Sequence, residues 1–315
     1  MHAPNIPLHL SLTELHFIDS ALQCGNFRST IGGFSPVTRG IVTLPDQRTV
    51  FAKRAVDEQS ATWIQKEAAV YRLLAELGYE HVPPLLGSTE KLLVLPDLSS
   101  ADWSSRWTRA KVTAVWQALH ELRAISIPEQ HRSLFEPDTG KALPEEWRKL
   151  LDDELWRKVL NRAREFEPDT DDLRLLCSLT PAQRCELAER VTATEFLRNE
   201  LVHLDIRSDN IAYDPVAGTV RLVDWNWAEL SSSCLDETLF ALSLLSAPID
   251  GLATAEIVAK VDPAAALTAA GYWLRSCIND PLKPGDPDGL RPLQLSLGCR
   301  ALRLSIEKPE AGQRP

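Results

Sequence analysis

The stretch VHLDIRSDNI, residues 202–211, and the stretch RLVDW, residues 221–225, decide how this chain is interpreted. The first places Asp205 and Asn210 five residues apart in one polar segment between apolar residues. The second ends a short apolar run, 220–223, which predicts a strand that leads directly into Asp224. Two carboxylates and an amide are therefore expected at the ends of neighbouring elements.

These residue types suit the transfer of a phosphoryl group. That reaction needs an acceptor oxygen held in line and the charge on the phosphoryl oxygens neutralised, with little covalent chemistry from the protein. Asp205 can accept a hydroxyl proton and orient the nucleophile, while Asn210 and Asp224 offer oxygen ligands to Mg²⁺. The alternative is a capped turn beside a surface strand, since Asp and Asn favour turns. The joint order and spacing favour the site.

Three neighbours of these residues have competing interpretations. His203 is expected to be a buried residue that anchors the loop, because kinase chemistry gives that position no proton transfer. Arg207 is a catalytic candidate that could hold the transferring phosphate, and a salt bridge with Asp209 or Asp214 is an equally good interpretation. Trp225 is predicted to pack in the core.

The order His203, Asp205, Asn210, Asp224, with Trp225 after it, resembles the catalytic segment of the aminoglycoside phosphotransferase family. In that family a His-x-Asp loop runs through Asn to a strand-borne Asp. The resemblance extends over most of the chain. It implies a protein-kinase-like fold, with Asp205 as the catalytic residue and with Asn210 and Asp224 as the metal ligands.

The resemblance also assigns one structural acid and exposes one departure. Asp236 would brace the catalytic loop from a helix. Leu204 stands where the family usually has a small Gly between His and Asp, a change expected to alter the packing of the loop without removing a ligand.

The first hundred residues predict a small antiparallel sheet with one helix. Turn signals at Gly32-Gly33 and Pro45-Asp46 separate the strand-like runs, and the helix ends at Gly78. The expected strands are 27–31, 37–43, 49–53, 84–87 and 92–95, and the expected helix is 60–77.

This part supplies the expected nucleotide site. The tight turn 31–36 could bring backbone N–H groups of Gly33, Phe34 and Ser35 to phosphates. Lys53 lies in the third strand, where a kinase lysine reaches the phosphates, and Glu67 on the next helix could fix it. A solvated surface position is the alternative for both.

A hinge for the nucleotide base is predicted over 92–98. Its backbone, with Val94 and Pro96, resembles the kinase hinge that pairs with a purine edge. It does not discriminate between ATP and GTP.

After Asp97 the pattern becomes helical, with helices expected over 109–124, 144–165, 181–199, 236–245, 264–277 and 290–306. The predicted fold class is α+β: a bilobal protein-kinase-like fold with a small antiparallel-sheet N-terminal lobe, containing one helix, and a larger, mostly helical C-terminal lobe. The predicted domains are a nucleotide-binding lobe, 1–96, and a catalytic and substrate-binding lobe, 97–315.

The composition of the chain limits which kinds of binding partner are expected. A net charge of −10 disfavours nucleic acid, and no apolar run is long enough to span a membrane. The six scattered cysteines form no CxxC pair, which favours reduced thiols in the cytoplasm and argues against structural zinc. We expect a monomer or weak dimer whose cofactors are Mg²⁺ and ATP or GTP.

The predicted function is transfer of the γ-phosphate to a hydroxyl of a small molecule, with an antibiotic of aminoglycoside, nucleoside or peptide type favoured. Alternatives are a metabolic kinase of the choline, homoserine or fructosamine type, or an inactive nucleotide-binding regulator. The segment between Asp224 and Asp236 is too short for a protein-kinase activation segment. Two kinds of substrate contact are expected. One is a group of acidic residues at the opening of the site, Asp209, Glu229 and Glu237, for which a solvated acidic surface is the alternative. The other is the aromatic face of Trp227.

Overall fold

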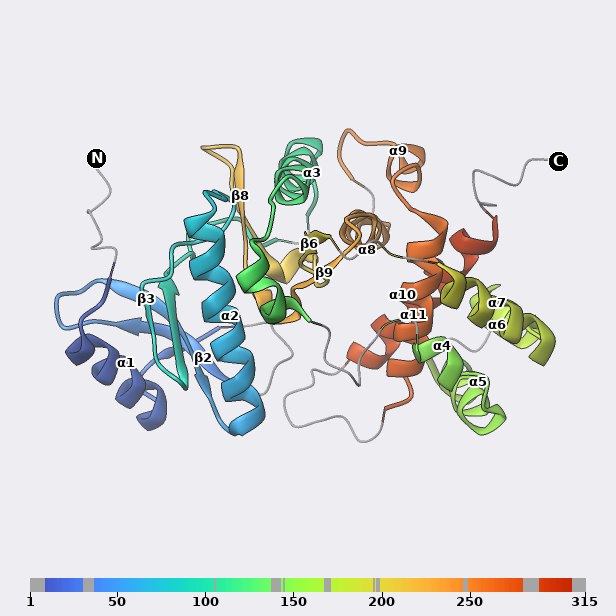
Figure 1. Cartoon of the computed structure of the whole chain (residues 1–315), viewed down its shortest axis with the longest axis horizontal. Coiled ribbons are helices and arrows are strands. Elements are labelled where there is room, and N and C mark those ends of the chain that lie inside the picture. The colour runs from blue at the N-terminus through green and yellow to red at the C-terminus, as the bar shows by residue number, and fades with distance from the viewer. Residues whose placement is uncertain are drawn as a thin grey trace. The chain divides into compact units, whose positions relative to one another are not determined.

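The computed structural model describes residues 9–30, 37–104, 106–136, 143, 145–166, 171–194, 196, 199–245, 249–279 and 289–307 (Figure 1). The chain forms two compact units. The first comprises Met1–Leu134 and Asp205–Ala228, and the second comprises Phe135–Leu204 and Glu229–Pro315. The first unit therefore contains all of the predicted nucleotide-binding lobe together with the segment of Asp205, Asn210 and Asp224. A boundary of function at residue 96 remains a prediction.

The first unit is built on an antiparallel sheet with strand order β1-β2-β3-β5-β4. Strand β2 (Val37–Thr43) has the predicted bounds, and β3 (Thr49–Ala55) and β5 (Leu92–Pro96) run slightly longer than predicted. The two edge strands are shorter or displaced: β1 is Arg28–Ser29 and β4 is Gly87–Ser88. Edge strands have a partner on one side only, which makes their extent the hardest to predict.

One face of this sheet is covered by a helix that the sequence interpretation missed, α1 (Leu12–Cys24). Its apolar side packs in one buried cluster with Val42, Val50 and Ala52 of the sheet. The helix begins at a capping box, in which Ser11 and Glu14 bond each other's backbone N–H, and ends at Gly25 in the left-handed conformation.

Helix α2 (Glu58–Glu76) matches the predicted helix closely and packs against β3 and β5. A hairpin of β7 (Ile211–Asp214) and β8 (Thr219–Leu222) completes this unit with helix α3 (Arg109–Arg123), which packs on β8. In β3 successive side chains alternate between faces, so Val50 and Ala52 contact the α1 cluster while Lys53 points to the opposite face. The sheet thus separates the buried cluster under α1 from the face that carries Lys53.

The second unit is mainly helical. Its centre is the packed pair α10 (Pro263–Ser276) and α11 (Leu290–Glu307). Around this pair lie α4 (Glu145–Lys149), α5 (Asp153–Phe166), α6 (Asp171–Ser178), α7 (Pro181–Ala193) and α8 (Cys234–Leu244). Helix α9 (Thr254–Val258) contacts α8, and β6 (Glu200–Val202) and β9 (Glu229–Ser231) form a short antiparallel pair.

Two predicted helices are corrected here. The helix expected over 144–165 is two helices, because Asp152 accepts hydrogen bonds from the N–H groups of Glu154 and Leu155 and starts α5 anew. The helix expected over 181–199 ends at Ala193, and Thr194 is already extended. Helices α6 and α9 were not predicted. Within the described residues no helix has both the length and the apolarity needed to cross a bilayer.

Candidate active site

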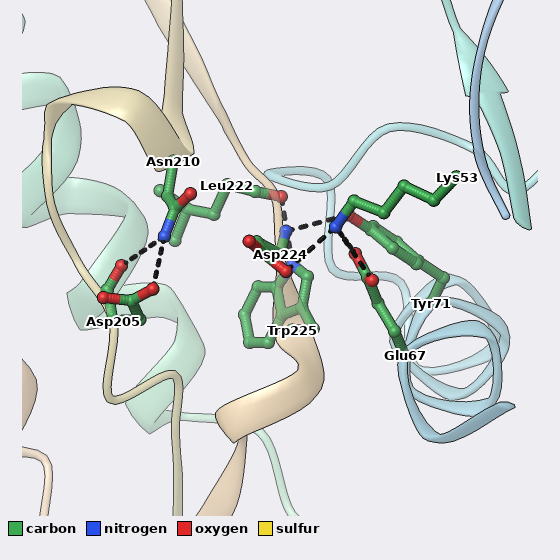
Figure 2. A network of polar contacts seen from close by, with 8 residues as sticks. All are labelled: Lys53, Glu67, Tyr71, Asp205, Asn210, Leu222, Asp224 and Trp225. Atoms are coloured by element: carbon green, nitrogen blue, oxygen red, sulfur yellow. Dashed lines mark hydrogen bonds and ion pairs between the residues drawn. The ribbon is translucent and has the colours of Figure 1, made fainter. Parts of the chain in front are cut away.

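A buried ion-pair cluster links three elements of the first unit (Figure 2). Lys53 Nζ from β3 lies 2.9 Å from both carboxylate oxygens of Glu67 on α2 and 2.9 Å from Asp224 Oδ1, just after β8. All three residues are buried, with exposed fractions of 7%, 2% and 7%. The alternative of solvated surface residues is therefore wrong for Lys53 and Glu67.

The charges of this cluster depend on one another. Burial alone would lower the pKa of Lys53, but the carboxylates of Asp224 and Glu67 outweigh it and raise that pKa, so the ammonium stays charged. Burial raises the pKa of Glu67, and the charge of Asp224 adds to this effect while Lys53 opposes it. One cation thus holds two carboxylates that would otherwise repel each other.

Tyr71 belongs to the same cluster, and sequence reasoning missed it. Its hydroxyl accepts a hydrogen bond of 3.3 Å from the backbone N–H of Asp224. Burial, with the charges of Glu67 and Asp224, raises its pKa well above the ordinary value, which keeps the phenol neutral. Tyr71 lies four residues after Glu67, so the helical spacing could have indicated that both face the same way.

A second polar group surrounds Asp205 (Figure 2). Asn210 Nδ2 donates to the Asp205 carboxylate oxygen Oδ2 at 2.8 Å and to the Asp205 backbone carbonyl at 2.9 Å. Arg207 Nε lies 3.0 Å from Asp205 and 3.1 Å from Asp209. The salt-bridge interpretation of Arg207 is thus confirmed with Asp209 as its partner, and with Asp205 as a second one.

The environment of Asp205 shifts the pKa of its carboxyl group. Burial raises its pKa to about 6, with further increases from the charges of Asp224 and Asp209, while Arg207 and Asn210 oppose the shift. The side chain is still 25% exposed, so the carboxylate remains reachable. A base with this pKa is mostly ionised at pH 7 and can still hold a proton.

The loop that carries Asp205 begins in a strained conformation. Leu204 has φ 62°, in the left-handed region that favours glycine. Asp236 on α8 accepts hydrogen bonds from the backbone N–H of His203 at 2.7 Å and of Leu204 at 2.8 Å. Asp236 thus braces the loop as the resemblance implied, and His203 is fully buried.

The hairpin brings Asn210 and Asp224 together. Ile211 pairs with Leu222 in the β7–β8 register, and the N–H of Val223 donates to the Asn210 carbonyl at 3.0 Å. The residues at the open end of the hairpin are therefore neighbours by backbone pairing. Asp224 also takes a left-handed conformation, with φ 70°.

The donor set at this end fits a hard divalent cation. The side-chain nitrogen of Asn210 donates a hydrogen bond to Asp205, and its amide oxygen points away from that carboxylate (Figure 2). Asp224 adds a carboxylate to this set of oxygen ligands. Mg²⁺ is commonly held by one or two carboxylates while phosphates and water fill its other positions. In the described part of the chain no three His, Cys, Asp or Glu side chains gather as a metal site. Asn210 and Asp224 would leave such positions open.

Both predicted hinge residues lie on β5, and a contact of their backbone with a nucleotide base stays a prediction. Val94 packs in the buried cluster under α1, and its carbonyl accepts from Leu86, so its side chain is not brought to Lys53. Pro96 ends β5 opposite Val50. Gly33, Phe34 and Ser35 lie outside the described residues.

The residues predicted to contact substrate fall in both units. Asp209 and Trp227 belong to the first unit, whereas Glu229 on β9 and Glu237 on α8 belong to the second. All four are half-buried rather than fully exposed. Trp225 is fully buried and donates from Nε1 to the Leu222 carbonyl at 3.0 Å, which confirms its predicted place in the core.

Arg39 is a further charged residue that the sequence interpretation left out. It lies on β2 directly opposite Lys53. Burial lowers the pKa of its guanidinium, and the carboxylates of Asp224, Glu67 and Asp209 oppose that shift. The alternation of side chains along β2 could have indicated it, once the register with β3 was known.

Solved structures share this fold. The choline kinase LicA from Streptococcus pneumoniae superposes with a TM-score of 0.55 at 14% identity, covering 95% of this chain and 100% of that one. The chain has a protein-kinase-like fold. Spectinomycin phosphotransferase APH(9)-Ia, in complex with ADP and spectinomycin, gives 0.52 at 11% identity, covering 92% of this chain and 97% of that one. The predicted α+β class is confirmed.

A third structure of this fold is an aminoglycoside phosphotransferase from Alicyclobacillus acidocaldarius, with a TM-score of 0.51 at 15% identity, covering 98% of this chain and 95% of that one. LicA has also been crystallised with AMP. No family model and no curated protein sequence matches the chain.

Proposed function

We propose that this chain transfers the γ-phosphate of ATP or GTP to a hydroxyl group of a small molecule. The observation that carries the proposal is the grouping, within one compact unit, of a carboxylate with a pKa of about 6, Asp205, its amide partner Asn210, and the buried Lys53–Glu67–Asp224 cluster. Each is a part that phosphoryl transfer requires. The fold shared with choline and aminoglycoside kinases supports it.

The reaction is assigned as a direct displacement. The acceptor oxygen forms a bond to the γ-phosphorus, the bond from that phosphorus to the bridging oxygen breaks, and the nucleoside diphosphate leaves. Asp205 takes the hydroxyl proton and orients the oxygen. Asn210 holds the Asp205 carboxylate through its bond of 2.8 Å, and Arg207 stabilises the ionised form from 3.0 Å.

Asn210 and Asp224 would hold Mg²⁺. When bound, the ion neutralises charge on the phosphate oxygens. Lys53 binds the phosphate chain of the nucleotide, and Glu67 fixes its ammonium group in place. The buried position of the pair keeps the lysine in one conformation before the nucleotide arrives, which lowers the entropy cost of binding.

For the acceptor we favour an antibiotic of aminoglycoside type, or of the nucleoside or peptide type, over a metabolic alcohol. The structural neighbours support both classes, since they include a spectinomycin phosphotransferase and a choline kinase. A net charge of −10 suits an amine-bearing acceptor of either class. We propose Asp209 and Trp227, which lie in the same unit as Asp205, as its contacts.

The test is a panel of antibiotics and metabolites, including spectinomycin, choline and ethanolamine, incubated with ATP or GTP and Mg²⁺. Phosphorylated product is read by mass. We expect one class of alcohol to gain a phosphoryl group, and Asp205→Ala to lower turnover at least about a hundredfold with nucleotide affinity nearly unchanged. Turnover of Asp205→Ala close to wild type would reject the assignment.

A matched control and the regulator alternative complete the design. Asp214, at the far end of the same hairpin, caps the turn through bonds from Val216 and Ala217. Asp214→Asn keeps an acceptor there and is expected to leave turnover unchanged. An inactive nucleotide-binding regulator would bind ATP or GTP and transfer phosphate to no alcohol of the panel.

A further inference from the structure

The sheet presents a second cation beside Lys53. Arg39 on β2 is the direct cross-strand partner of Lys53 on β3. Directly opposed residues in an antiparallel pair extend from the same face, with Cβ atoms about 5 Å apart. Arg39 therefore shares the face of Lys53. Arg54, the next residue along β3, points to the other face, where its Nε lies 2.9 Å from Asp19 on α1.

The surroundings of Arg39 are those of a site residue. The side chain is half-buried. Burial lowers the pKa of its guanidinium, and carboxylates from three separate segments oppose that shift: Asp224 after β8, Glu67 on α2, and Asp209 in the loop after Asp205. Because Arg39 and Lys53 extend from the same face of the sheet, a phosphate chain that meets Lys53 would also come near Arg39.

Lys53 by itself has little capacity left for an anion. An ammonium group has three N–H donors, and in this structure three carboxylate oxygens lie 2.9 Å from Nζ. Binding a phosphate oxygen requires that one of these be exchanged. A guanidinium has five donors in a planar fork that matches phosphate oxygens, so it can hold a carboxylate and a phosphate together.

We propose that Arg39 binds the phosphate chain of the nucleotide as a second cation beside Lys53. The inference rests on the proposed function and adds a residue to it. Its rival is a purely electrostatic role, in which Arg39 only offsets the repulsion among the site carboxylates. The two roles differ in one measurable way: phosphate binding makes the effect of Arg39 depend on the number of phosphates in the ligand.

The experiment measures dissociation constants of ATP, ADP and AMP by calorimetry, with Mg²⁺ present, for wild type, Arg39→Gln, Arg39→Lys and the control Arg54→Gln. We expect Arg39→Gln to weaken ATP binding about tenfold or more and AMP binding less than about threefold. Tenfold corresponds to about 1.4 kcal/mol. Arg39→Lys keeps the charge and should recover part of the loss. Arg54→Gln should bind all three nucleotides as wild type does.

The result that overturns the inference is ATP binding by Arg39→Gln within about twofold of wild type, or equal losses for ATP and AMP. Thermal unfolding of each variant separates these results from misfolding, because a folded Arg39→Gln keeps one cooperative transition. Failure of the proposed function looks different: wild type itself would bind no nucleotide, or would bind it and phosphorylate no alcohol.

Discussion

Replacing the proposed base should make the protein more stable at neutral pH. The folded protein raises the pKa of Asp205 from 3.8 to about 6, chiefly through burial. The folded state then holds a proton on this group more tightly than the unfolded state does. Stability is therefore greatest below the unfolded value, and it falls as the pH rises from about 3.8 to about 6. Asp205→Asn removes the charge and hence this penalty.

The magnitude follows from the shift. A change from 3.8 to about 6 corresponds to about 3 kcal/mol at pH 8, where both states are ionised. At pH 4 the penalty is only about 0.5 kcal/mol, because the folded carboxyl is already protonated. With the side chain 25% exposed, water screens part of the effect, so a gain of about 1–2 kcal/mol is expected for Asp205→Asn at pH 8.

The assay is urea unfolding of wild type and Asp205→Asn at pH 8 and at pH 4, followed by circular dichroism. We expect the variant to be more stable at pH 8, the difference to fall below about 1 kcal/mol at pH 4, and phosphotransferase turnover to be lost. The reasoning would be refuted if the variant were less stable than wild type at pH 8, or if its gain in free energy of unfolding were the same at both pH values. The conservative Asp214→Asn, in the exposed hairpin turn, is the control for a change of net charge.

Three further outcomes test other parts of the site. The kcat/KM of the transfer reaction should rise with pH through about 6, and Asp209→Asn should move this rise to lower pH, because Asp209 raises the pKa of Asp205; an unmoved profile counts against the assignment. Lys53→Met should lower the free energy of unfolding by about 3–5 kcal/mol, since it leaves two buried carboxylates without their cation. Adding Glu67→Gln should recover part of that loss in the same denaturation assay, and simple additivity of the two changes would contradict this. Asp236→Ala should cost about 2–3 kcal/mol by removing a buried acceptor of two backbone N–H groups, and a cost below about 0.5 kcal/mol in thermal unfolding would show that the brace is dispensable.

The sequence predicted those parts of the fold whose signals are local and repeated. Strand β2 and helices α2, α10 and α11 were expected nearly within their bounds, because each carries an uninterrupted apolar period. The prediction of one helix over 144–165 was wrong because a single capping residue, Asp152, divides this segment. The spacing of apolar residues alone does not indicate where a cap lies.

Some features had a sequence signal that was not used. Ser11 and Glu14 have the spacing of a capping box, and Leu15, Ile18 and Leu22 recur at helical intervals, which together indicate α1. Other features had no local signal. That Arg39 faces Lys53 depends on the β2–β3 register, which a sequence read one strand at a time does not specify.

The conformation of the residues just before Asp205 shows why local backbone preference does not determine the candidate site. A leucine disfavours φ 62°, so nothing in the local sequence selects that backbone at Leu204. The conformation persists because a carboxylate from α8 accepts two backbone hydrogen bonds there, at His203 and Leu204. Such hydrogen bonds to a charged acceptor contribute about 1.5–3 kcal/mol, more than the roughly 1–2 kcal/mol that the strained residue costs. The backbone conformation of Leu204 is therefore stabilised by Asp236, which lies much later in the sequence, and a Gly at 204 would relieve strain without replacing that constraint.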